Sequence, residues 1–410
     1  MTTRFFSLAS SLVALGALTA CEQPTPESAG LSAFEIAGMP TPAGPGSTEP
    51  NLAVAPDGQV MLSWVEPADD SAHALRFSVW RDSAWTAPRT IARRTDFWLN
   101  WADFPTMASL GGGVLAAHWP QRSGSGRYDY DVRIALSRDG GDSWSEGIVP
   151  HPDSRLGEHG FVAMAAASDS LLAVWLDGRG YDTTKAGATR QMALVSRTLA
   201  PNGSLGEERI VDARTCDCCQ TDMAITARGP VVVYRDRTDN EIRDLVLSRR
   251  EPLGWTTPRV IYEDGWHVDY CPVNGPAVAA RDSRVVAAWF TAANDTPVVR
   301  VAFSEDAGDS FGAPVRVDDG TPIGRVDVAL LADGSAAVTW MERLGSEGAE
   351  VRVRRVMPDG TRGAASVIGG STAARASGFP RMAVAGDMLV FAWTQPGDSA
   401  RVHTARARLP

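Results

Sequence analysis

The sequence predicts an all-β protein made of seven copies of one four-stranded antiparallel unit, and three observations carry this prediction. Seven short apolar segments each end in an aromatic residue, and these aromatic residues recur every 51 to 59 positions. A turn signal and a second short apolar segment precede each one, and no stretch keeps a helical period. A period of this length is typical of a β-propeller blade. The segments are Val60–Trp64, Val114–Trp119, Leu171–Trp175, Val231–Tyr234, Val285–Trp289, Ala336–Trp340 and Leu389–Trp393.

The first twenty residues are predicted to be a signal peptide. Arg4 supplies a positive charge, an apolar run extends from Phe5 to Leu18, and Leu18–Cys21 resembles the bacterial lipobox. We therefore expect lipidation of Cys21, with residues 21–47 as a flexible tether and residues 48–410 as the propeller. The predicted location is the bacterial cell envelope, on the outer membrane, facing the periplasm or the exterior. An ordinary cleaved signal is the alternative.

The last repeat lacks an outer strand, because its third strand, Arg401–Leu409, ends at the C-terminus. A strand-like segment, Ala33–Ala37, precedes the first repeat and belongs to none of the seven. We expect the region near 32–38 to supply the missing strand, which closes the ring and covers a sheet edge. Seven blades is the prediction, and six blades is the alternative.

The net charge of −10 among 410 residues excludes the basic surface that nucleic-acid binding requires. The same argument disfavours a basic membrane-binding patch, so membrane contact is expected through the lipid anchor alone. The chain is expected to be a monomer.

Two octapeptides between third and fourth strands carry a further signature. Ser137–Trp144 and Ser304–Phe311 both fit the pattern Ser-x-Asp-x-Gly-x-x-aromatic, and Ser78–Trp85 and Ser248–Trp255 are degenerate copies. They resemble the Asp boxes of the BNR-repeat propellers, whose best-known members are exo-sialidases. The resemblance covers residues 50–410. The aspartates of the two full copies, Asp139 and Asp306, are expected to stabilise hairpins.

The resemblance implies an exported protein that binds or hydrolyses an acidic glycan at the mouth of the propeller channel. Sialidases bind the substrate carboxylate with three arginines, use a Tyr/Glu pair as nucleophile and protonate with an aspartate. If this chain is an enzyme, the resemblance implies a glycoside hydrolase of exo-sialidase type. The first blade of the sialidases begins with the motif Arg-Ile-Pro. The matching place in this sequence reads Thr48-Glu49-Pro50-Asn51 and has no arginine, so the motif assigns no catalytic residue here.

Loops that enter first strands and leave second strands open on one face of a propeller, and chemistry-bearing residues gather in them. The candidate acid/base residues are Asp177, Asp236, Glu158 and His159, because glycosidases need two carboxyl groups and histidine titrates near neutral pH. The candidate ligand-binding residues are Arg179, Arg235, Arg237, Arg325 and Trp266, since guanidinium groups bind carboxylates in pairs of hydrogen bonds. Salt bridges between blades are the alternative role for the arginines.

Four further cysteines lie in two of these loops. Two disulfides are the favoured interpretation in an exported protein, and every pairing joins Cys271 to the other loop. The alternative is a copper or zinc site that includes His267, in a non-enzymatic metal-binding or scaffold propeller. The candidate ligands are Cys216, Cys218, Cys219, Cys271 and His267.

Overall fold

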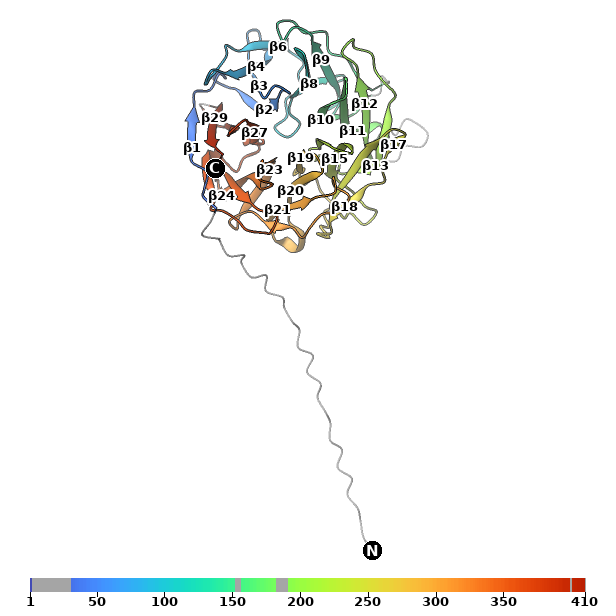
Figure 1. Cartoon of the computed structure of the whole chain (residues 1–410). Coiled ribbons are helices and arrows are strands. Elements are labelled where there is room, and N and C mark those ends of the chain that lie inside the picture. The colour runs from blue at the N-terminus through green and yellow to red at the C-terminus, as the bar shows by residue number, and fades with distance from the viewer. Residues whose placement is uncertain (2–30, 152–155, 182–190, 399, 410) are drawn as a thin grey trace.

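The computed structural model describes residues 1, 31–151, 156–181, 191–398 and 400–409. Seven antiparallel sheets surround a central channel, which confirms the seven-bladed propeller (Figure 1). The only helices in the described residues are three short 3₁₀ turns, and none is long or apolar enough to span a membrane. The predicted signal peptide and the lipidation site Cys21 lie outside the described residues and stay predictions.

The first four blades follow one another along the chain, each running from an inner strand at the channel to an outer strand at the rim (Figure 1). Blade 2 has three strands in the described residues, and its fourth place holds one isolated bridge between Ile134 and Ile148. The strands of blades 1 and 2 are β2 (Thr48–Val54), β3 (Val60–Pro67), β4 (His73–Arg81), β5 (Ala84–Trp85), β6 (Arg89–Arg94), β7 (Thr106–Gly111), β8 (Val114–Arg122) and β9 (Tyr130–Ser137). Those of blades 3 and 4 are β10 (His159–Ala167), β11 (Ser170–Asp177), β12 (Met192–Leu199), β13 (Arg209–Thr215), β14 (Asp222–Thr226), β15 (Gly229–Arg235), β16 (Leu245–Glu251), β17 (Gly254–Trp255) and β18 (Arg259–Tyr262).

Blades 5 to 7 complete the ring, and the inner strand of blade 7 contacts that of blade 1. Their strands are β19 (Ala277–Arg281), β20 (Arg284–Thr291), β21 (Val298–Ser304), β22 (Val315–Arg316), β23 (Pro322–Leu330), β24 (Ala336–Leu344), β25 (Gly348–Val356), β26 (Ser366–Thr372), β27 (Arg381–Ala385), β28 (Met388–Gln395) and β29 (Arg401–Arg408).

The N-terminal strand closes the last blade, as predicted. Strand β1 (Ile36–Met39) pairs antiparallel with β29, with Ile36 opposite Ala407. The paired segment begins three residues later than Ala33, where the sequence placed it. Phe34, just before the strand, is buried in the core between blades 6 and 7, and its carbonyl accepts a hydrogen bond from Ser366. The outer edge of β29 is therefore covered.

The aromatic residue near the end of each second strand is buried. Four of these tryptophans are fully buried between adjacent sheets, so their large apolar rings form the core of the propeller. Three of them donate the indole N–H to a carboxylate two residues later, which satisfies a donor that burial would otherwise leave unpaired. The pairs are Trp64 with Glu66, Trp175 with Asp177 and Trp340 with Glu342, at 2.7, 3.0 and 2.6 Å.

A ring of side chains joins neighbouring blades near the channel. In each case a side-chain oxygen of one blade accepts a hydrogen bond from a backbone N–H of the next blade. These hydrogen bonds fix the position of each blade relative to the next. These pairs are Asn51 with Met107, Asp103 with Phe161, Asp222 with Val278, Asn274 with Arg325 and Asp327 with Met382, at 3.3, 2.7, 2.8, 2.7 and 2.8 Å.

The two full Asp boxes form the hairpins expected of them. Asp139 accepts hydrogen bonds from the hydroxyl group of Ser137 at 2.7 Å and from the N–H of Ser143 at 2.9 Å. The hydrogen bonds from Ser143 hold the pKa of Asp139 well below its usual range. Asp306 repeats this arrangement. Both boxes lie at the edge of the propeller opposite the loops that carry the candidate site.

Candidate functional site

The mouth of the channel is formed where first strands begin and second strands end. Glu158 and His159 lie at the start of β10, and Asp177, at the end of β11, pairs with His159 across the sheet. Arg235 ends β15, and Trp266 lies in the loop between β18 and β19. The structure therefore places the predicted site residues of blades 3, 4 and 5 on one edge of the propeller, as the repeat alignment predicts.

Asp177 and Arg179 form a bridge within blade 3. Asp177 is fully buried and accepts hydrogen bonds from Trp175 and from Nε and Nη2 of Arg179, at 2.7 and 2.6 Å. Burial opposes ionisation most strongly, but the hydrogen bonds and charge of Arg179, the charge of His159 and the hydrogen bond from Trp175 together outweigh it and lower the pKa of Asp177 to about 2. Arg179 also contacts Glu208 at 2.7 Å. This geometry is that of a structural ion pair, and a carboxyl group with this pKa stays ionised at neutral pH.

Arg235 and Arg325 are buried and bind backbone carbonyl oxygens. Arg235 is 1% exposed and donates to the carbonyl groups of Asn274, Arg243 and Phe290, with its guanidinium group 4.7 Å from the ring centre of the buried Trp266. Arg325 is 4% exposed and donates to Ala374 and Gly378. Both arginines hold the loops around the mouth in place, and neither presents its guanidinium group to solvent.

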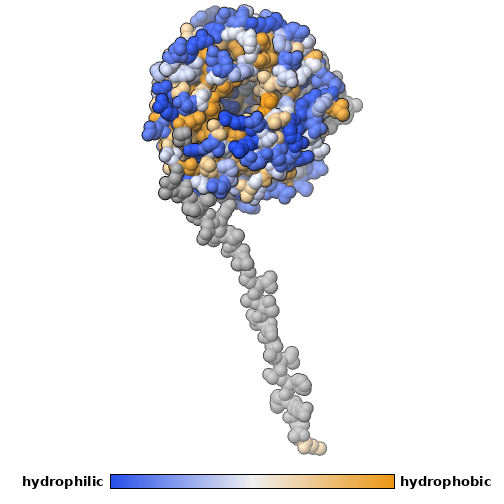
Figure 2. Space-filling model, in the orientation of Figure 1, coloured by the Kyte–Doolittle hydropathy of each residue, from blue (hydrophilic) through white to orange (hydrophobic). Residues whose placement is uncertain are grey.

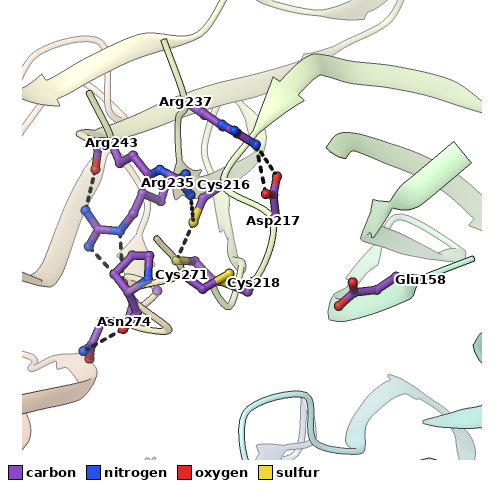
Figure 3. The surroundings of a disulfide bond; sticks show 12 residues. Glu158, Cys216, Asp217, Cys218, Arg235, Arg237, Arg243, Cys271 and Asn274 are labelled. Atoms are coloured by element: carbon purple, nitrogen blue, oxygen red, sulfur yellow. Dashed lines mark hydrogen bonds and ion pairs between the residues drawn. A yellow bond between two sulfur atoms is a disulfide. The ribbon is translucent and has the colours of Figure 1, made fainter. Parts of the chain in front are cut away.

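Arg237 keeps a side chain that is 19% exposed. It contacts Asp217 and Glu241, both at 2.9 Å, so it links the cysteine loop to the loop after β15 (Figure 3). Burial raises the pKa of the neighbouring Asp236.

The cysteines bring two loops of adjacent blades together. Cys218 and Cys271 form a disulfide with a Cα–Cα distance of 6.0 Å, which confirms that the two loops meet (Figure 3). The Sγ atoms of Cys216 and Cys219 are buried and 2.8 Å apart. Although burial raises it, the hydrogen bond from Cys219 and the charge of Arg243 lower the pKa of Cys216. The second disulfide stays a prediction.

A soft-metal site also stays a prediction. Among the described residues, the sulfur atoms close enough to share an ion belong to Cys216, Cys218 and Cys219. Cys218 is already bonded to Cys271, and His267 is exposed outside this group.

Sequence reasoning missed two residues that pack against Glu158. The hydroxyl group of Tyr130, on β9, donates to Glu158 at 3.0 Å, and the Tyr130 ring is fully buried against Trp98 with ring centres 3.8 Å apart. Asp103, 1% exposed, lies close to Tyr130 and lines the channel. Glu158 is half-buried, and its carboxyl group points towards the cysteine loop (Figure 3).

No positively charged side chain in the described part of the chain contributes to the pKa shifts of Glu158 and Asp103. Burial raises the pKa of Glu158 to about 8, against the hydrogen bond from Tyr130, and raises that of Asp103 to about 7. Burial and the charge of Asp103 also raise the pKa of Glu49 well above its usual range. The site thus combines two carboxyl groups that titrate near neutrality, a pattern that active sites use for proton transfer.

The channel below this group is hollow. A cavity of about 370 Å³ extends between the inner strands and is lined by Asp103, Gln220, Asp222 and Arg381 among others. Figure 2 shows the propeller hollowed at its centre. Three tyrosines in the mouth loops, Tyr128, Tyr181 and Tyr270, are 48%, 41% and 65% exposed.

No protein-family model matches the chain, and no curated protein matches it. Among solved structures, the chain is similar to polysaccharide lyase Uly1, with 10% identity over 88% of this chain and 90% of that one and a TM-score of 0.52. The phage phi92 endosialidase gives 11% identity over 92% and 70%, with a TM-score of 0.51. The Hadza microbial sialidase Hz136 gives 14% over 72% and 63%, with a TM-score of 0.46. At these identities, the likeness to Uly1 and to the phi92 endosialidase shows a shared fold alone.

Proposed function

We propose that the protein is a carbohydrate-active enzyme that hydrolyses a glycan at the channel mouth, with Glu158 as proton donor. The observation that carries this proposal is the half-buried Glu158, which accepts a hydrogen bond from Tyr130 and lies near Asp103. Burial raises the pKa of Glu158 to about 8. The shared fold of Uly1 and the phi92 endosialidase is consistent with a glycan ligand and does not identify one.

Cleavage of a glycosidic bond needs an acid that is still protonated near neutral pH and a second carboxyl group nearby. Glu158 meets the first requirement because burial keeps its proton on at pH 7. Asp103 supplies the second group, and its ionised form would stabilise positive charge that develops on the sugar ring. Tyr130 is fully buried, so its oxygen reaches no substrate unless Glu158 moves. In this geometry Tyr130 positions Glu158.

The mouth offers the contacts that a sugar chain requires. The exposed rings of Tyr128, Tyr181 and Tyr270 provide apolar faces with polar tips, on which pyranose rings stack. Of the arginines expected to bind an acidic sugar, Arg179 and Arg237 remain partly exposed. Arg179 is bound to Asp177 and Glu208, whereas Arg237 lies next to Asp217, whose charge acts on Glu158. We assign the binding of an acidic sugar to Arg237. The carboxylate of the sugar would replace Asp217 as a partner of its guanidinium group.

The test is turnover of a panel of fluorogenic sialosides, uronic-acid polysaccharides and neutral glycans by the purified protein and two variants. Glu158→Gln keeps the shape of the side chain and removes its proton chemistry, so we expect a loss of about 100-fold or more. Glu66→Gln is the matched control, because Glu66 is a partly buried carboxylate bound to Trp64 in blade 1. Unchanged turnover by Glu158→Gln, or no turnover of any glycan by the unmodified protein, would contradict the proposal.

A further inference from the structure

A second cluster of potential ligands lies directly beside the Tyr130–Glu158 pair. Asp131 on β9, His151 after blade 2 and His159 on β10 bring one carboxylate oxygen and two ring nitrogens within 4.8 Å of one another. The side chains of both histidines are fully buried, and that of Asp131 is 14% exposed. The cluster joins blade 2 to blade 3 and shares no residue with the cysteine loop.

The surroundings of His159 distinguish it from an ordinary core histidine. Its Nδ1 lies 3.4 Å from the carbonyl oxygen of Tyr130, whereas its Nε2 has no hydrogen-bond partner in the described residues. An oxygen of the Asp177 carboxylate lies 3.7 Å from Nε2, too far for a hydrogen bond. His159 thus has one ring nitrogen near a backbone carbonyl and the other without a hydrogen-bond partner among the described residues. Proteins often hold a metal-binding imidazole by one nitrogen in this way and leave the other for the ion.

We propose that Asp131, His151 and His159 bind one divalent transition-metal ion of the zinc class. Two imidazoles and one carboxylate are a donor set that zinc, iron and nickel accept, unlike the all-oxygen sets of magnesium and calcium. Ligand atoms lie about 2.1 Å from such an ion and about 3.4 Å from one another in tetrahedral geometry. The candidate atoms, which lie within 4.8 Å of one another, would therefore move closer by up to about 1.4 Å on binding. The two rings are stacked, with centres 4.0 Å apart, so one ring turns about its Cβ–Cγ bond to face the ion.

An ion at this site would hold Tyr130 and Glu158 in fixed positions relative to each other. Tyr130 immediately precedes Asp131, and Glu158 immediately precedes His159, so an ion held by these ligands would lock the two strands that carry the pair. The proposal does not depend on catalysis, because metal content and stability report on it whether or not a glycan is hydrolysed.

The experiment uses the full chain, dialysed against chelator and then titrated with Zn²⁺. We expect about one ion per chain by elemental analysis and a melting temperature that rises by several degrees, since the ion binds the folded state. Cobalt substitution identifies the ligands, because histidine and carboxylate ligands give visible bands without the thiolate-to-cobalt band that the cysteine loop would produce.

His159→Asn and Asp131→Asn should each abolish the bound ion and the rise in melting temperature. His118→Asn is the matched control: His118 on β8 is equally buried and its Nε2 also lacks a partner, but it belongs to no such cluster in the described residues. If His159→Asn does not fold, Asp131→Asn and the cobalt spectrum still decide. No Zn²⁺-dependent stabilisation, a thiolate band, or an ion retained by both variants would overturn the proposal.

Discussion

The buried Asp177 and the half-buried Glu158 are two carboxyl groups at the same edge of blade 3, yet their pKa values are shifted in opposite directions. The N–H of Gly178, next to Asp177, donates to the carbonyl group of Glu158 at 2.7 Å, so the two residues are neighbours. Asp177 has a pKa of about 2 and Glu158 one of about 8. Arg179, which binds Asp177 on two nitrogens, makes the largest contribution that lowers the pKa of Asp177, and His159 and Trp175 add to it. Glu158 instead faces the charges of Asp103 and Asp217, which raise its pKa. Burial alone therefore does not decide which carboxyl group can donate a proton; the nearest cation does.

The largest expected effect comes from removing that cation. Arg179→Met leaves Asp177 buried and ionised without its partner, and breaking a buried pair in this way costs about 3–5 kcal/mol of unfolding free energy. Denaturant unfolding at pH 7 measures the loss. The double variant Arg179→Met/Asp177→Asn is the control, and it should recover part of the stability because the unpaired charge is gone. If the single variant is as stable as the unmodified protein, Asp177 does not depend on Arg179.

The two carboxyl groups should also give opposite pH dependences of stability. The pKa of Glu158 is raised from an ordinary 4.5, so between about pH 4.5 and 8 the unfolded chain has lost a proton that the folded chain retains. The unfolding free energy therefore falls as pH rises through this window. Asp177 has a lowered pKa, so its contribution is present above about pH 4 and is lost as pH falls towards 2.

Glu158→Gln isolates the first of these contributions. The melting temperature of the variant, relative to the unmodified protein, should increase between pH 5 and pH 8, because the variant has no proton to retain at this position. Asp103 keeps part of the slope in both proteins, since its pKa is also raised. A difference between the two melting curves that does not change with pH would contradict the raised pKa of Glu158.

The smallest effect is expected from Tyr130→Phe. The hydroxyl group donates to Glu158 and lowers its pKa, so its loss should cost about 1 kcal/mol and raise the pKa of Glu158 further. In a pH–rate profile, the alkaline limb should move to higher pH while the protein stays folded. Tyr128→Phe, on the exposed neighbouring tyrosine, should move neither quantity. An unshifted limb in Tyr130→Phe would remove Tyr130 from the site.

The sequence predicts the blades well because their signal is local and repeated. Each aromatic residue, from Trp64 to Trp393, ends an apolar strand after a turn, and strand ends in a propeller must meet at a common edge. The same logic places Glu158, Arg235 and the cysteine loops at the mouth. It could not find Asp103, which lies in the irregular segment between β6 and β7, or tell that Tyr130 turns inward against Trp98.

The sequence also left open the role of the arginines at the mouth, since a guanidinium group at the end of a strand can face either solvent or a neighbouring loop. The carbonyl groups that receive Arg235 and Arg325 belong to segments around Asn274 and Gly378, whose paths depend on the packing of the next blade. Such paths are set by contacts between residues about 40 to 55 positions apart, and no local pattern encodes them.

The pairing of β1 with β29 has a consequence for the order of folding. The first strand of the described fold hydrogen-bonds to the last, so this contact spans almost the whole chain and cannot form until the C-terminal strand is available. During synthesis, blades can form one after another from their local hairpins, while β1 has no partner strand. Ring closure is thus expected to be the last and slowest step of folding, and until then the edge that β29 will occupy is open to pairing with other chains.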